Sequence, residues 1–234
     1  MQELRFEVKP YGADAVLLSF GDEISLAIHN QVKQLYSELR NYAKKGIRAV
    51  IPGYCTVTIL FEPKMVSLNE VVELSKNIVD NNKVQDEKKY KVRIPVCYDK
   101  QFALDWEVIC DYTGLKWEEV VELHCCNEYL VYMLGFVPGF LYLGGLNEQI
   151  RIPRKSSPRL KIPKGAVGLA DNQTGVYPLE TPGGWQLIGN APVDLIGVNS
   201  AVVEMGDYLE FFPITKKQHA SYSKQIERIL VNEN

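Results

Sequence analysis

The sequence has little net charge, no basic leader and no long apolar run free of helix breakers, and each absence excludes a class of protein. The formal net charge of −3 excludes a chain-wide attraction to nucleic acid or to an anionic membrane, so any anion binding must be local. The first ten residues, MQELRFEVKP, lack the basic start and apolar core of a signal peptide, and we expect a cytoplasmic protein. The uncharged run 129–146 contains Gly135, Pro138 and Gly139, which argue against a membrane helix.

Metal and nucleotide motifs are also missing. The cysteines form an odd set without a repeated CxxC spacing, which argues against a disulfide framework and against a structural zinc site. They are Cys55, Cys97, Cys110, Cys125 and Cys126. The chain has no Walker A sequence, no GxGxxG after a strand, no HExxH and no GxSxG. We therefore expect no bound metal, and a self-contained hydrolase or NTPase of a standard type is disfavoured.

The N-terminal half alternates strand-like and helix-like patterns. The predicted elements are a strand at 14–20, a helix at 24–42, hairpin strands at 47–51 and 55–61, and a helix from residue 67. Pro52-Gly53 marks the hairpin turn, and Ser67 with Glu70 forms a capping-box pattern. This order predicts a small ferredoxin-like domain, completed by a strand at 90–96 unless that strand belongs to the next domain.

A polar run without an apolar face, residues 80–89, predicts the linker between two domains. We place the domains at 1–86 and 87–234. Two short helices are predicted beyond the linker, at 104–111 and 116–124. The second of them carries three glutamates, which would repel phosphates, so the pair does not predict a DNA-binding helix-turn-helix.

From Tyr129 onward the pattern changes to short strands punctuated by Gly and Pro, which predicts a small closed β-barrel. The expected strands lie within 129–135, 159–170, 175–180, 185–189 and 207–214. A polar C-terminal helix is predicted from Lys216 to Leu230. The predicted fold class is therefore α+β, a ferredoxin-like domain followed by a barrel.

Six cations and no acid lie between Glu148 and Asp171, which gives this stretch a formal charge of about +6. They are Arg151, Arg154, Lys155, Arg159, Lys161 and Lys164. Arginines bind carboxylate and phosphate in bidentate fashion, so the stretch could seat an anion. A solvated basic rim, or a docking surface for an acidic partner, explains the same pattern equally well.

The segment that follows combines amide, phenol and indole groups. Gln173 and Gln186 donate and accept hydrogen bonds, as does the phenol of Tyr177, and the indole of Trp185 can form a wall. Such a set could recognise a small polar amide, although buried Tyr and Trp are common core residues. His124 could serve as a general base, or could cap the end of its helix.

Three motifs, YMLGFVPGFLYLGGL, IPRKSSPR and GVYPLETPGGWQLIG, resemble the allophanate hydrolase subunit 1 family. That family includes the B subunit of the bacterial ATP-dependent 5-oxoprolinase and the sporulation-kinase inhibitor Kip I. The resemblance covers residues 90–213 in motif order. It implies an α+β N-terminal domain, a cyclophilin-like β-barrel, and assembly with the A and C subunits of the 5-oxoprolinase.

The implied reaction opens 5-oxo-L-proline to L-glutamate and hydrolyses ATP, a co-substrate of the complex, to ADP and phosphate. On this interpretation Arg154 and Arg159 would hold a carboxylate or phosphate, and Gln173, Tyr177 and Gln186 would orient the amide substrate or line the contact with the C subunit. His124 would be the acid/base candidate at the barrel mouth. The chain departs from the family pattern at Leu141, where Pro is usual, and at Asn190-Ala191, where Arg-Thr is usual; the second change removes a possible anion donor.

Two other functions fit the same resemblance. The chain could inhibit a histidine kinase, as Kip I does. It could instead belong to a urea- or allophanate-type amidase or carboxyltransferase, but the latter needs a biotin carrier and this sequence has no Met-Lys biotinylation pattern.

Overall fold

The computed structural model describes residues 5–40, 42, 46–81, 89–196 and 202–231, and the chain forms two compact units, 1–87 and 88–234. Most of the predicted linker, residues 82–88, lies outside the described residues. The two units are described separately below. Both combine helices with β-sheet, so the prediction of a mixed α and β fold is confirmed.

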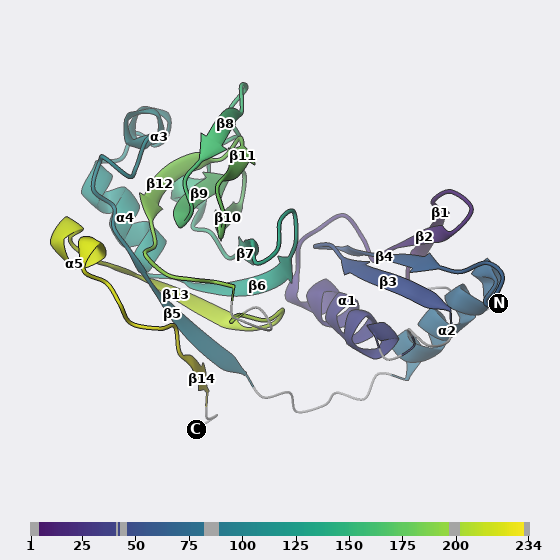
Figure 1. The fold of residues 1–234 in the computed structure, drawn as a ribbon. Helices are drawn as coiled ribbons and strands as arrows, with labels where there is room; N and C mark the ends of the chain where they lie inside the picture. Colours follow the sequence, from purple (N-terminus) through teal and green to yellow (C-terminus); the bar gives the residue numbers. More distant parts are fainter. Residues whose placement is uncertain (1–4, 41, 43–45, 82–88, 197–201, 232–234) are drawn as a thin grey trace. The chain divides into compact units, whose positions relative to one another are not determined.

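The first unit is a four-stranded antiparallel sheet with two helices, which lie on the same face of the sheet in Figure 1. Its elements are β1 (Glu7–Pro10), β2 (Ala15–Ser19), α1 (Leu26–Leu39), β3 (Ile47–Pro52), β4 (Thr56–Phe61) and α2 (Leu68–Asp80), and the strand order is β1-β2-β4-β3. The predicted capping box is present, because the Ser67 hydroxyl accepts from the Glu70 N–H and the Glu70 carboxylate accepts from the Ser67 N–H.

The strand expected to complete this first sheet is not part of it. Residues 90–96 form β5 (Tyr90–Val96), which pairs with strands of the second unit. The fourth strand of the first sheet is β1, which we did not predict. Phe6 and Val8 alternate with Glu7 and Lys9 there, but the strand has only four residues and ends at Pro10.

The second unit is built on an eight-stranded sheet of order β12-β9-β10-β7-β6-β13-β5-β14 (Figure 1). Its further strands are β6 (Glu128–Leu134), β7 (Leu141–Gly144), β9 (Ala166–Ala170), β10 (Gln173–Val176), β12 (Gln186–Asn190), β13 (Tyr208–Pro213) and β14 (Arg228–Leu230). A separate two-stranded sheet pairs β8 (Arg159–Ile162) with β11 (Thr181–Gly183). The strands predicted within 129–135, 159–170, 185–189 and 207–214 are thus confirmed. The run predicted at 175–180 is strand only at its first two residues, in β10, and β7, β11 and β14 were not predicted.

The large sheet closes on itself, because an antiparallel bridge joins Cys97, just after β5, to Asn190 at the end of β12. The Cys97 and Asn190 N–H groups each donate to the carbonyl of the other residue, at 2.9 and 3.0 Å. Gly189 permits this approach, since an added Cβ would lie 2.8 Å from the Cys97 carbonyl oxygen. The closed ring encloses an apolar core that includes Ile94, Val131 and Leu169.

The two helices predicted after the linker are confirmed, whereas the predicted C-terminal helix is much shorter than expected. Helix α3 (Trp106–Thr113) ends at Gly114 in the left-handed region, and α4 (Trp117–Cys125) follows. The predicted C-terminal helix stops after one turn, α5 (Lys216–Ala220), and residues 228–230 form β14 at the edge of β5. Arg228 explains the change, because its guanidinium pairs with the carboxylate of Asp207 at 2.8 Å and lies over the ring of Tyr90.

No helix in the described part of the chain is long and apolar enough to cross a membrane. The uncharged run 129–146, which raised that question, forms strands β6 and β7 and the turn between them.

Candidate functional site

Four aromatic side chains gather on one face of the sheet, beside the small β8–β11 sheet. Phe140 is the centre of the group, with ring centroids 4.7 Å from Tyr142, 4.8 Å from Tyr177 and 5.4 Å from Trp185. We call these four residues the aromatic cluster. Gly175 makes room for them, because a Cβ there would lie 2.8 Å from the Trp185 ring and 3.2 Å from the Phe140 ring. Most of the cluster is buried, although Tyr142 remains partly accessible.

The alternation of side chains along β10 separates two sets of candidate residues. Gly175 faces the aromatic cluster, so Gln173, two residues earlier, projects toward the same face. Thr174 projects to the opposite face, where its hydroxyl bonds to His124. Gln173 and Tyr177 therefore share a face with Trp185, and His124 lies on the other side of the strand.

Arg154 lies opposite Trp185 because the two chain segments that carry them run side by side. The Pro153 carbonyl accepts from Gln186 Nε2 at 3.2 Å, and the Lys155 N–H donates to the Gly184 carbonyl at 2.7 Å. The residues on either side of Arg154 are thus tied to the residues on either side of Trp185. The Arg154 guanidinium carbon lies 5.9 Å from the Trp185 ring centroid, and its side chain is 57% exposed.

Burial and nearby charge act in opposite directions on the two phenols of the cluster. Burial raises the pKa of Tyr177 to about 12, although the positive charges of Arg154 and Arg159 act to lower it. Burial likewise raises the pKa of Tyr142, against the charge of Arg154. Both phenols are therefore neutral at pH 7, and Tyr177 can act as a hydrogen-bond group but not as a base.

In the structure, neighbouring acidic side chains offset much of the positive charge of the basic stretch. Each of its cations pairs with an acid: Arg151 with Glu148, Arg154 with Asp171, Lys155 and Arg159 with Asp105, Lys161 with Glu180, and Lys164 with Asp194. The formal charge of about +6 is thus offset by acids that lie elsewhere in the sequence. Arg154 is the cation best placed for a ligand, since its contact with Asp171 is long, 3.6 Å, and both side chains are more than half exposed.

Asp105 is the residue that sequence reasoning missed. Its carboxylate is 2% exposed and accepts from Lys155 Nζ at 3.0 Å, from both terminal nitrogens of Arg159 at 2.8 Å, and from the Leu187 N–H at 2.7 Å. Burial alone would raise its pKa, but these hydrogen bonds, led by Arg159, hold the pKa below its ordinary value. An Asp directly before a helix predicts an N-cap, yet this side chain makes no capping hydrogen bond to α3.

His124 lies in the core and not at the barrel mouth, where we expected it. Its side chain is fully buried, with Nδ1 2.7 Å from the Tyr98 hydroxyl and Nε2 2.9 Å from the Thr174 hydroxyl. Thr174 donates its own proton to the Gly168 carbonyl, so it accepts from Nε2–H, and Nδ1 accepts from Tyr98. Burial lowers the pKa of His124 to about 3, and the ring is therefore neutral at pH 7.

The two glutamines differ in their surroundings. Gln186 is buried, and its amide nitrogen supports Pro153, so half of its side chain already has a structural partner. The amide oxygens of Gln173 and Gln186 have no hydrogen-bond partner among the described residues. In native proteins, a buried acceptor without a protein donor usually bonds to water or to a ligand.

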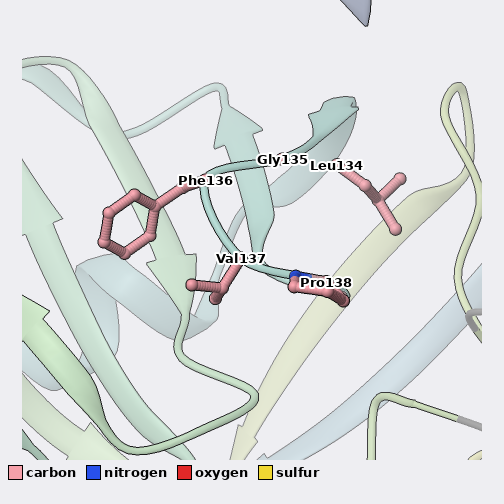
Figure 2. A pocket seen from close by; sticks show the side chains of 6 residues that line it. Leu134, Gly135, Phe136, Val137 and Pro138 are labelled. Carbon is pink, nitrogen blue, oxygen red and sulfur yellow. The ribbon is translucent and has the colours of Figure 1, made fainter. Parts of the chain in front are cut away.

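The turn between β6 and β7 forms an open apolar pocket of about 400 Å³, lined by residues 134–139. Figure 2 shows Phe136 at the tip of this turn, with its ring directed away from Leu134 and Pro138. The ring is 62% exposed and meets Phe140 edge-on at 5.7 Å, so the turn continues the aromatic cluster to the surface. Phe136 adopts a φ of 65°, and Val137 N–H donates to the Gly135 carbonyl across it, a strained turn of the kind that occurs at functional sites.

The part of the chain that the structure describes contains no group of three or more His, Cys, Asp or Glu side chains placed to hold a metal ion.

The comparisons with known proteins agree with this sheet architecture. The model of the family described as "Carboxyltransferase domain, subdomain C and D" matches residues 6–203, and the chain belongs to that family. A curated relative from Bacillus subtilis (strain 168) is named as the B subunit of 5-oxoprolinase. It is 35% identical over 236 residues, which cover 95% of this chain and 98% of the relative. The resemblance found in the sequence is thereby confirmed.

Two solved structures have a similar fold in longer chains. The crystal structure of TTHA0988 is 31% identical with a TM-score of 0.75, and the match covers 86% of this chain and 40% of that one. The K. lactis urea amidolyase has a TM-score of 0.80 at 16% identity, over 99% of this chain and 17% of that one, which shows a shared fold alone.

Proposed function

We propose that the chain is the B subunit of an ATP-dependent 5-oxoprolinase, which opens 5-oxo-L-proline to L-glutamate with hydrolysis of ATP to ADP and phosphate. The observation that supports it most strongly is the match to a relative of that name over nearly the whole of both chains. The name of the relative implies further subunits, and we propose that this chain acts with the A and C subunits in the cytoplasm. The chain lacks a nucleotide-binding motif of its own, which fits a non-autonomous subunit.

The chemistry of the reaction explains why such a subunit would present hydrogen-bond donors. A five-membered lactam is a poor electrophile, and phosphorylation of its amide oxygen would turn that oxygen into a leaving group. Groups that stabilise the developing negative charge then contribute most to the rate. The substrate also carries a carboxylate, which an arginine binds well.

The face with the aromatic cluster offers these groups together. We propose that the Arg154 guanidinium binds the substrate carboxylate above the ring of Trp185, and that Gln173 and Tyr177 orient the lactam. Arg159 is held by Asp105 and Gln186 by Pro153, so both support this face from behind. His124 is assigned a structural role, because both of its ring nitrogens already bond to hydroxyls in the core and it lies on the opposite side of β10.

The finer description of the fold belongs to the same proposal. The closed ring of strands in the second unit supports a cyclophilin-like barrel. In the first unit, β1 takes the edge position next to β2, which gives a ferredoxin-like arrangement with an N-terminal instead of a C-terminal edge strand.

A second candidate, carboxyl transfer onto urea or another amide, is favoured by the family's description and by the shared fold with urea amidolyase. It requires a biotin carrier from another chain. Release of glutamate from 5-oxoproline, or its absence, separates the two reactions.

The proposal is tested by replacing Arg154 in the reconstituted complex. We expect Arg154→Gln to raise the KM for 5-oxoproline by about 10- to 100-fold, since a hydrogen bond to a charged group contributes roughly 1.5–3 kcal/mol. The measurement is the initial rate of ATP-dependent glutamate release as a function of 5-oxoproline concentration. Arg151→Gln is the matched control, because Arg151 belongs to the same stretch but pairs with Glu148. Equal KM values for the two variants would contradict this placement of the substrate.

A further inference from the structure

Asp105 stands at the point where three chain segments meet. Its carboxylate bonds to Lys155 and Arg159 of the basic stretch and to the backbone N–H of Leu187 in β12, and its own N–H donates to the Leu187 carbonyl at 3.2 Å. The start of α3, the basic stretch and β12 are thus joined through one buried acid. Breaking such a group costs much more than breaking a surface ion pair, because two cations would lose their counter-charge.

The bonds of Asp105 reach residues that lie within two positions of Arg154 and Trp185. Lys155 follows Arg154 directly, and Leu187 lies two residues after Trp185. Between these anchors the two segments are cross-linked by the bonds from Pro153 to Gln186 and from Lys155 to Gly184. The mutual position of the Arg154 guanidinium and the Trp185 ring therefore depends on a network of bonds that Asp105 completes.

The geometry of α3 supports a role beyond helix capping. Asp is a preferred N-cap residue because its side chain can accept from the first free N–H groups of a helix. Asp105 occupies the N-cap position of α3 and makes no such bond. Its carboxylate instead accepts hydrogen bonds from the basic stretch and from β12. This is the arrangement expected of a residue that supports a binding site.

We propose that Asp105 is a positioning residue, which holds Lys155, Arg159 and the β12 backbone so that the Arg154 guanidinium stays over Trp185 in the orientation that receives a carboxylate. This inference rests on the proposed function for the identity of the ligand. The positioning itself is a property of this chain and is measurable without partners.

The first measurement is therefore made on the isolated chain. In the wild-type protein we expect the ring current of Trp185 to shift the side-chain NMR signals of Arg154, which would be assigned by their loss in Arg154→Gln. We expect Asp105→Asn to move these signals toward unstructured values and Asp194→Asn to leave them unchanged, since Asp194 pairs with Lys164 in the same stretch but is exposed. Unchanged Arg154 signals in Asp105→Asn would overturn the proposal.

The second measurement is the KM and kcat of the reconstituted complex. A misplaced binding group weakens substrate binding, so we expect Asp105→Asn to raise the KM for 5-oxoproline on the order of tenfold, with kcat changed less than about twofold. A merely structural loss would reduce the amount of active complex, and hence the apparent kcat, at an unchanged KM. That second pattern together with unchanged NMR signals would overturn the proposal. Displaced NMR signals with an unchanged KM would show that Asp105 positions Arg154 but that Arg154 does not bind 5-oxoproline, which contradicts the proposed function.

A second, less disruptive variant keeps the proposal testable if Asp105→Asn does not fold. Lys155→Gln removes only the bond that reaches the residue next to Arg154 and leaves the bidentate pair of Asp105 and Arg159 in place. We expect it to displace the Arg154 signals and raise the KM in the same direction by a smaller factor. If the wild-type complex releases no glutamate, the proposed function is wrong, and the NMR comparison still decides whether Asp105 positions Arg154.

Discussion

At the scale of single residues, one set of buried polar groups in the second unit is linked in a chain of hydrogen bonds. This chain runs from Cys125 to the Tyr98 hydroxyl, on to His124 and then to Thr174, which donates to the Gly168 carbonyl. Each donor finds an acceptor only when the imidazole is neutral. His124 therefore links α4 to the barrel strands and makes that link sensitive to pH.

The pH dependence has a definite sign. The pKa of His124 is lowered in the folded protein to about 3 from an ordinary 6.5, so protons bind more tightly to the unfolded chain. The contribution of the neutral ring to stability is complete above pH 6.5 and is lost as the pH falls from 6.5 toward 3. We expect the free energy of unfolding of the wild-type protein to fall by about 1.5 kcal/mol more than that of His124→Gln between pH 6.5 and 5.

Urea unfolding at several pH values checks this expectation. Gln is a suitable replacement because it keeps one donor and one acceptor and does not titrate. Parallel stability curves for the two proteins would show that His124 is not buried in a neutral state.

At the scale of elements, the aromatic cluster packs against β10 at Gly175, a position without a side chain. An added Cβ at Gly175 in β10 would lie 2.6 Å from the Leu141 carbonyl oxygen and 2.8 Å from the Trp185 ring. Neither the backbone nor the indole can retreat without disturbing Phe140 or Tyr142. The close packing of β7, β10 and β12 is thus encoded by a glycine.

We expect Gly175→Ala to destabilise the protein by about 1–3 kcal/mol, because overpacking a well-packed site forces its neighbours out of their preferred positions. The near-ultraviolet circular dichroism of the aromatic residues should change as well. Gly135→Ala is the matched control, since a Cβ at that position has nothing within 4 Å. Equal unfolding free energies for the two variants would contradict the packing described for β10.

The helices and most strands were predictable, because their signals are local. The capping box of α2 and the Gly114 end of α3 are visible in a few consecutive residues. The site was less predictable, because its partners are distant in sequence. The acids that pair with the basic stretch range from Asp105 to Asp194, and Asp105 itself looks like an ordinary N-cap. The edge strands β1 and β14 were missed because short edge strands carry little periodicity.

At the scale of the whole molecule, the family match spans both units, from residue 6 to residue 203. The second unit carries every candidate residue that sequence reasoning singled out, together with Asp105. A similar fold forms part of the longer chains of TTHA0988 and of the K. lactis urea amidolyase.

The most direct test of this account is the release of glutamate from 5-oxoproline in the presence of ATP, compared for this chain alone, for the A and C subunits alone, and for all three together. The account predicts release only in the triple mixture, with ADP and phosphate formed in step with glutamate. Release by the A and C subunits without this chain, or no release from three folded proteins, would contradict it, and the second result would shift the assignment to kinase inhibition or to another amide substrate.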